Sequence, residues 1–200
     1  MIIDSLDNTI QIKIVYFGPA MSGKTTSLKA LFNHFGKKKE VASVESTVGR
    51  TLFFDYGVIN FQNDNWKLKI HAYSTTGQDF YVVTRPITLK AVDGIIFVAD
   101  SQKNAYERNL ISWGELNSYF GDTLLKMPKL IALNKDDLPN KFSPAVFLKD
   151  IDFHMLRNIH TTKTIALNGE GILESFEKIL ALIFKELYGS QMISNLNYGN

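Results

Sequence analysis

The chain has 200 residues, 45% of them hydrophobic and 21% charged, which is enough for one domain with a buried core. Its formal net charge is only +2, and the one basic cluster, 37–39, has no aromatic residues interleaved, so nucleic-acid binding is not expected. The absence of cysteine excludes disulfides, thiolate metal sites and cysteine-linked lipids. No apolar run approaches the roughly 18 residues of a membrane span. The start MIIDSLDNTIQ lacks a basic region followed by an apolar one, so a signal peptide is not expected. We therefore expect a cytoplasmic protein without a direct membrane anchor.

Short apolar runs alternate with helical patterns, which is typical of a mostly parallel sheet with helices on both faces. The predicted strands are 10–17, 51–59, 66–73, 94–100, 129–134 and 163–167, and the predicted helices are 24–35, 105–119, 144–148 and 171–188. The strands 51–59 and 66–73 flank a polar turn, so they form a hairpin that provides one antiparallel edge strand. We divide the chain into an N-terminal extension (1–9), one α/β domain (10–188) and a polar C-terminal tail (189–200).

A phosphate-binding loop follows the first predicted strand. The sequence GPAMSGKT fits G-x-x-x-x-G-K-[ST] and is followed by a predicted helix, which is the context that the motif needs. Its glycines allow backbone N–H groups to turn around phosphate oxygens, and the helix N-terminus attracts negative charge. The lysine reaches the β- and γ-phosphates, while the hydroxyl of Thr25 binds Mg²⁺. The predicted contacts come from Gly18, Ala20, Met21, Ser22, Gly23, Lys24, Thr25 and Thr26.

The tetrapeptide NKDD, directly after the strand 129–134, indicates that the base is guanine. The carboxylate of Asp136 accepts from guanine N1–H and the exocyclic amine, whereas adenine would leave it unpaired. We expect Asn134 to brace the loops and the aliphatic stem of Lys135 to lie against the face of the base. By spacing, Ala166 and Leu167 lie where a backbone N–H would meet the guanine carbonyl oxygen. The Ser-Ala-Lys motif that is usual at this position is missing.

These motifs, in this order, resemble the Ras-like small GTPases, and more closely the MglA family of bacterial polarity GTPases and their archaeal relatives. The segments that carry the resemblance are GPAMSGKTT, GRTLFFD, STTGQDFY, VDGIIFVADSQ and NKDDLP, and it covers residues 10–188. It implies a P-loop NTPase fold of the Ras-like type and a GTP/GDP switch that needs Mg²⁺. It also implies a GTPase-activating partner of the Roadblock/LC7 type, similar to MglB. Effectors are not indicated.

The second switch segment departs from the usual Ras pattern at the metal. Ser74 stands where an aspartate usually holds Mg²⁺ through a water, and the MglA family also has a hydroxyl residue there. The metal would then rely on Thr25 and Thr51, with phosphate oxygens and water. Asp55 is the nearest carboxylate that could replace the missing charge, but it lies about 13 Å from Thr51 along a straight strand. A hydrogen-bonded aspartate at the strand edge is the alternative interpretation.

The resemblance also implies which residues hydrolyse GTP. Gln78 matches the glutamine that orients the attacking water, and the N–H of Gly77 senses the γ-phosphate. Arg50 matches an arginine that the MglA family supplies from its own first switch. Such an arginine accelerates hydrolysis by roughly 10³ to 10⁵ when it is correctly placed. With Lys24 and Thr51, these residues form the predicted catalytic set. A solvent-facing loop residue is the alternative for Arg50.

Two other functions compete with a GTPase switch. Ser74 motivates a pseudo-GTPase scaffold that binds nucleotide without significant hydrolysis, whereas Gln78 argues against it. An ATP-using kinase or ATPase is disfavoured by NKDD. Outside the motifs, we interpret Arg85 as structural and expect it to pair with a nearby carboxylate.

Overall fold

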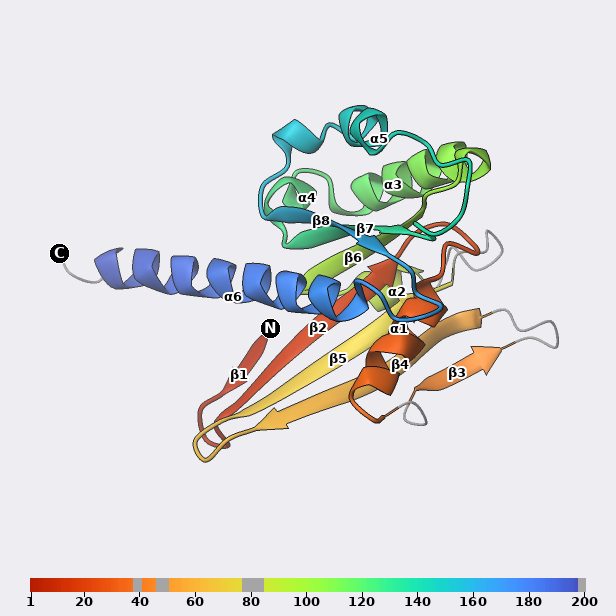
Figure 1. Cartoon of the computed structure of the whole chain (residues 1–200). Coiled ribbons are helices and arrows are strands. Elements are labelled where there is room, and N and C mark those ends of the chain that lie inside the picture. Colours follow the sequence, from red (N-terminus) through yellow and green to blue (C-terminus); the bar gives the residue numbers. More distant parts are fainter. Residues whose placement is uncertain (38–40, 46–50, 77–84, 198–200) are drawn as a thin grey trace.

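The computed structural model describes residues 1–37, 41–45, 51–76 and 85–197, and it describes only the backbone of 42–45, 51–54 and 188–197. Within these ranges the chain forms one mixed sheet in the order β3-β4-β5-β2-β6-β7-β8, with β1 paired to β2 (Figure 1). The run β5-β2-β6-β7-β8 is parallel, and the pairs β1–β2, β3–β4 and β4–β5 are antiparallel. The strands are β1 (Ile2–Asp4), β2 (Thr9–Phe17), β3 (Ala42–Glu45), β4 (Thr51–Gln62), β5 (Lys67–Thr75), β6 (Gly94–Asp100), β7 (Lys129–Asn134) and β8 (Ile159–Thr164).

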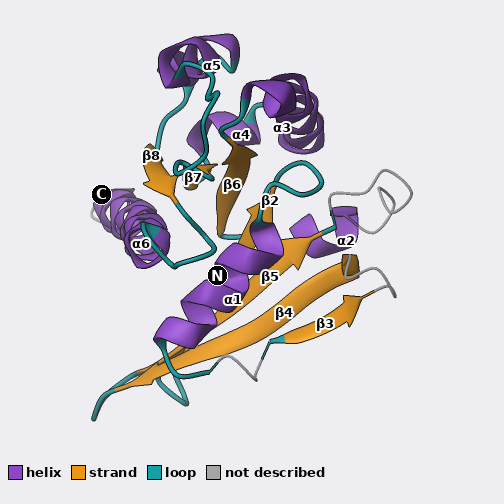
Figure 2. Ribbon diagram, turned by 45° about the vertical axis from the view of Figure 1, so that its right-hand side comes forward, coloured by secondary structure: helices purple, strands orange, loops and turns teal. Residues whose placement is uncertain are grey.

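Helices cover both faces of this sheet (Figure 2). On one face α1 (Lys24–His34) and α6 (Ile172–Asn197) bury Leu28, Phe32, Phe176 and Ile179 against the strands. The helices of the other face are α3 (Tyr106–Phe120), α4 (Thr123–Lys126) and α5 (Pro144–Asp150), which bury Trp113, Leu116, Leu124 and Phe147. The short segments are α2 (Arg85–Leu89), η3 (Lys103–Ala105) and η4 (Phe153–Met155). Within the described ranges, none of the helices combines the length and apolar character that a membrane span requires.

The predicted fold class is confirmed, and the predicted hairpin is formed by β4 and β5. The sequence missed β1 and β3, because three or four residues are too few to show a periodic pattern. The hairpin was expected to supply the antiparallel edge strand of the sheet. Because β3 pairs with the outer side of β4, the edge strand is β3 instead. The prediction for the last strand, 163–167, is also wrong: β8 is a largely polar edge strand that ends at Thr164, before the three apolar residues 165–167 that suggested it. The helix predicted to end at residue 188 continues to Asn197.

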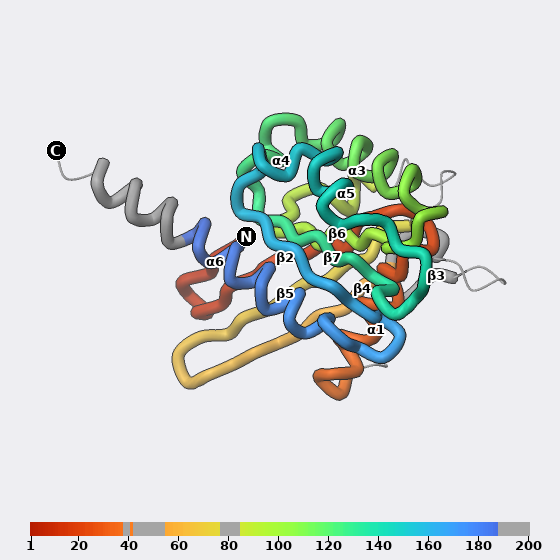
Figure 3. Tube along the Cα trace, turned by 45° about the horizontal axis from the view of Figure 1, so that its top comes forward, coloured from red at the N-terminus to blue at the C-terminus, as the bar shows by residue number. Residues whose placement is uncertain are grey.

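All five parallel strands point their carboxyl ends to one edge of the sheet, and β2 lies between the two halves of the strand order. In such sheets ligands bind at this edge, where the loops that follow neighbouring strands diverge. Figure 3 shows the loops after β7 and β8 beside the start of α1. A hydrogen bond from Asn134 Nδ2 to Ser22 O (2.7 Å) joins the loop after β7 to the loop before α1. The phosphate loop and the NKDD segment therefore meet at one place.

Candidate nucleotide-binding site

The phosphate loop runs from the end of β2 into α1 and requires glycine at two positions. A Cβ at Gly18, where φ is 143°, would lie 2.3 Å from the Val98 carbonyl oxygen. A Cβ at Gly23, where φ is 103°, would lie 2.2 Å from Asn134 Nδ2. Both positions combine a positive φ with a close approach of other atoms, which only glycine tolerates. The loop is thereby held tightly against β6 and against the loop after β7.

Lys24 is buried at the first position of α1, with 6% of its surface exposed. Its Nζ donates to the carbonyl oxygens of Gly18 (2.9 Å) and Pro19 (2.7 Å). Burial, the largest cause, and the nearby Arg85 together lower the pKa of Lys24 to about 7, while Asp55 and Glu115 act in the opposite direction. An amine that is held in a phosphate loop with so low a pKa will regain its proton when phosphate oxygens approach.

We expect nucleotide binding at alkaline pH to take up a proton at Lys24. With a pKa of about 7 in the nucleotide-free fold, uptake should rise from about half a proton at pH 7 to about one at pH 8.5. Calorimetry of GDP binding in buffers of different ionisation enthalpy measures this directly. The same shift makes the nucleotide-free fold more stable as pH rises from about 7 toward 10.5, because the unfolded chain keeps the proton over that range. Binding without proton uptake at pH 8.5 would contradict the assignment.

Asn134 joins three loops at the end of β7. Besides the bond to Ser22 O, its Oδ1 accepts from Thr164 Oγ1 (3.1 Å) and from the Ala166 N–H (2.9 Å). The side chain is only 2% exposed, so water does not replace these bonds. The geometry matches the bracing role that the sequence assigned to this residue.

Replacement of Asn134 by Ala should destabilise the protein by about 2–4 kcal/mol, because three buried groups, Ser22 O, Thr164 Oγ1 and the Ala166 N–H, lose their partner. Chemical denaturation of the nucleotide-free protein measures the change. As a matched control, Asn117→Ala on the exposed side of α3 should change stability by less than about 0.5 kcal/mol. Similar values for the two variants would show that Asn134 does not brace the site.

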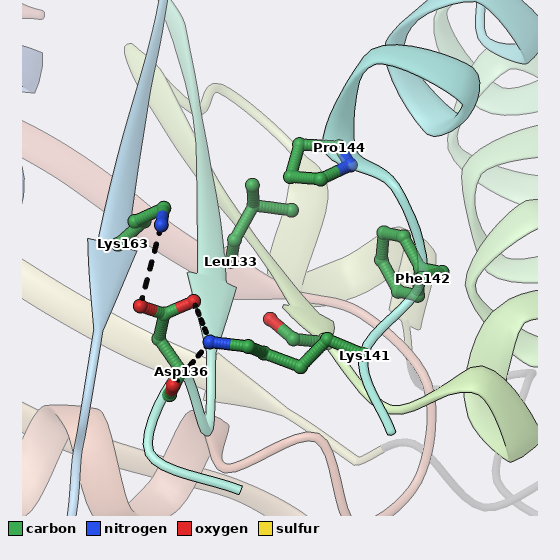
Figure 4. A pocket seen from close by; sticks show the side chains of 7 residues that line it. Leu133, Asp136, Lys141, Phe142, Pro144 and Lys163 are labelled. Atoms are coloured by element: carbon green, nitrogen blue, oxygen red, sulfur yellow. Dashed lines mark hydrogen bonds and ion pairs between the residues drawn. The ribbon is translucent and has the colours of Figure 1, made fainter. Parts of the chain in front are cut away.

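The predicted base-reading residues follow Asn134 directly. Lys135 has φ of 62°, and its Nζ donates to Asp100 Oδ2 at the end of β6 (2.7 Å). The Asp136 N–H donates to Thr164 O (3.2 Å), and its carboxylate contacts Lys141 and Lys163. A cavity of about 70 Å³ adjoins this carboxylate (Figure 4). The residues that line it are Ser101, Leu133, Asp136, Lys141, Phe142, Pro144 and Lys163.

The loop after β8 presents a backbone donor beside the NKDD segment. The Ala166 N–H is engaged by Asn134, whereas the Leu167 N–H has no acceptor among the described residues. The Leu167 side chain is 88% exposed beside the base-reading loop. Of the two residues that the sequence proposed for the guanine carbonyl, Leu167 is therefore the one with a donor to offer.

A carboxylate lies beside Thr25, at the start of α1. Thr25 Oγ1 donates to Asp55 Oδ2 over 2.5 Å, and Asp55 is fully buried. In the register of β4 and β5, Asp55 is directly opposite Ser74. The Ser74 hydroxyl is buried and has no hydrogen-bond partner among the described residues. The chain thus places a carboxylate on the strand that pairs with the position where the usual aspartate is missing.

Comparison with known proteins agrees with this geometry. The model of the ADP-ribosylation factor (Arf) family matches residues 1–183. The Mutual gliding-motility protein MglA of Myxococcus xanthus (strain DK1622) is 35% identical over 184 residues, which cover 89% of this chain and 93% of that protein. The chain belongs to the Arf/Ras-like small GTPases. It is an MglA-like member, and the predicted GTP-binding switch and GTPase class are confirmed.

Beside the phosphate loop of the GTPase lies a buried arginine that no nucleotide motif includes. Arg85 begins α2, is 5% exposed, and forms an ion pair with Glu115 of α3. Its Nε donates to Thr76 O (3.0 Å), and its guanidinium lies 6.0 Å from the centre of the Phe17 ring. The predicted pairing with a carboxylate is confirmed. Arg85 thereby also fixes the backbone at Thr76, within the second switch segment.

Several predicted catalytic residues of the GTPase have no described geometry. Arg50, Gly77 and Gln78 lie outside the described residues, and only the backbone of Thr51 is described, at the start of β4. The predictions for these residues rest on the sequence. The sequence, in turn, missed Asp100, Lys141 and Lys163, because no motif contains their contacts and only the fold brings them to the base-reading loop.

Proposed function

We propose that this GTPase holds guanine nucleotide with Mg²⁺ and hydrolyses GTP, slowly alone and faster with an activating partner. The observation that carries the proposal is the Asp55 carboxylate against the Thr25 hydroxyl, opposite Ser74. A chain that had lost its metal chemistry would have no need of a buried carboxylate at this point, because burying a charge without a functional partner is costly.

In the proposed metal site, Thr25 binds Mg²⁺ through its hydroxyl, Asp55 supplies the negative charge, and the orphan hydroxyl of Ser74 orients a bound water. Thr51 completes the set from the first switch. This donor set fits Mg²⁺, which binds few protein oxygens and keeps several waters. When bound, the ion neutralises the charge on the β- and γ-phosphate oxygens.

The remaining residues hold and read the nucleotide. Lys24 exchanges its two carbonyl acceptors for phosphate oxygens, which are the stronger acceptors. Asp136 accepts from the two donors of guanine, and the Leu167 N–H donates to the guanine carbonyl. The Lys135 stem, directed across the loop by its bond to Asp100, covers the base.

Gln78 and Arg50 perform the chemical step in this proposal. Gln78 orients the attacking water, and Arg50 stabilises the charge on the transferring phosphoryl group. Both follow the phosphate loop in the order usual for the two switch segments, and the resemblance to the MglA family supports both roles. A Roadblock/LC7-type homodimer that seats these two residues is the activator we propose.

Single-turnover hydrolysis of GTP tests the proposal. We expect slow turnover that requires Mg²⁺, is lost in EDTA, and falls by at least about 10²-fold in Gln78→Leu, because the water is no longer oriented. Adding a Roadblock-type homodimer should accelerate the wild type and not the variant. Tight GTP binding with no turnover, even with the activator, would instead identify a nucleotide-binding scaffold.

A further inference from the structure

Two lysines hold the carboxylate that reads the base (Figure 4). Lys141 Nζ donates to Asp136 Oδ1 (3.0 Å) and to the Asp136 carbonyl oxygen (2.6 Å). Lys163 Nζ lies 3.5 Å from the other carboxylate oxygen, Oδ2. The lysines approach from opposite sides, one from the segment before α5 and the other from β8. Each oxygen of Asp136 therefore faces its own ammonium group.

Both lysines are attached to backbone that the fold holds in place. Lys141 forms a β-bridge with Gln102, and the next residue, Phe142, is buried and donates its N–H to Ser101 O (3.0 Å). Lys163 is paired with Leu133 in the register of β7 and β8. The two ammonium groups therefore start from fixed points on either side of the base-reading loop.

Guanine recognition needs this carboxylate in one orientation. The N1–H and the exocyclic amine are parallel donors, so both oxygens must lie in the plane of the base, whereas the terminal torsion of a free aspartate is broad. An ionised carboxylate has about four acceptor positions, so the hydrogen bond from Lys141 and the ion pair with Lys163 leave positions for two bonds to the base. Ordering the acceptor before the ligand arrives lowers the cost of binding.

We propose that Lys141 and Lys163 are positioning residues that preset Asp136 for two-point recognition of guanine, and that they thereby set selectivity for guanine over bases without the exocyclic amine. This inference rests on the proposed role of Asp136. The lysines do not touch the nucleotide. They act through the carboxylate.

The test compares GTP with ITP, whose hypoxanthine keeps N1–H and lacks the amine. In the double variant Lys141→Met/Lys163→Met, affinity for GTP should fall by roughly tenfold, because the bidentate charge-assisted contact is no longer aligned. Affinity for ITP should fall less, so the GTP/ITP affinity ratio drops by about fivefold. Lys141→Arg should keep most of the ratio. Lys149→Met, which removes the same charge from an exposed position of α5, should leave the ratio unchanged.

The outcomes separate positioning from other roles. Equal losses for GTP and ITP would show that the lysines only stabilise the loop and would overturn the inference. A gain in GTP affinity would overturn it too, because the lysines would then compete with the base. Asp136→Ala is measured alongside. If this variant keeps its GTP affinity, the proposed base-reading role of Asp136 fails. If it loses GTP affinity while the GTP/ITP affinity ratio of the lysine double variant is unchanged, only the inference about the lysines is rejected.

Discussion

Asp136→Asn is expected to change the preferred nucleotide of this GTPase from GTP to XTP. Guanine presents two donors, N1–H and the amine, which match the two acceptors of a carboxylate. An asparagine presents one acceptor and one donor, so its amide opposes the guanine amine. Xanthine carries a carbonyl oxygen where guanine has the amine, and it therefore matches the amide. A site that hydrogen-bonds a ligand can reject the mismatched analogue by roughly 10⁴-fold, so both affinities should move strongly and in opposite directions.

Competition binding of GTP and XTP to the wild type and the variant measures this reversal. In the variant only one of the two lysines can contact the single amide oxygen. Lys141 also keeps its bond to the backbone carbonyl oxygen of residue 136, so the variant should keep the local loop structure. Asp137→Asn, one residue further in the same loop, is the matched control and should keep the preference for GTP. If Asp136→Asn retained tight GTP binding and gained nothing for XTP, the base would be read by other groups.

Asp55→Asn should remove most of the effect of Mg²⁺ on nucleotide affinity. The amide can still accept from the Thr25 hydroxyl, so the fold is kept while the negative charge near the metal is lost. Removing a group that orients metal ligands typically costs 10- to 100-fold in metal affinity, and we expect a loss of about this size. The measurement is the rate of GDP release with saturating Mg²⁺ and with EDTA, because the ratio of the two rates reports how well the metal holds the nucleotide.

The strand register supplies a rescue for this variant. Because Asp55 is directly opposite Ser74, adding Ser74→Asp to Asp55→Asn should return a carboxylate to the site from β5 and restore most of the Mg²⁺ effect. Asp64→Asn, an exposed carboxylate in the β4–β5 turn, should change nothing. An unchanged ratio of release rates in Asp55→Asn would support the alternative from the sequence, in which Asp55 is a structural strand aspartate.

The sequence by itself determined the features that lie within short contiguous segments. The phosphate loop, the NKDD tetrapeptide, the hairpin and the central strands β6 and β7 could all be predicted, because their chemistry depends on residue types at fixed local spacing. The alternation of apolar strands with amphipathic helices predicted the fold class for the same reason. The short strands β1 and β3 and the polar edge strand β8 lack such a local pattern, so their positions were missed or misplaced.

The tertiary structure decided how distant residues combine at the site. The separation of Asp55 from Thr51 along the strand made its role ambiguous, and only the packing of β4 beside α1 places its carboxylate on Thr25. The commitment of the Ala166 N–H to Asn134 and the contacts of Lys141 and Lys163 with Asp136 likewise depend on three loops converging at one edge of the sheet. These contacts join residues far apart in the chain, and their geometry is set by strand order and register, which no local spacing encodes.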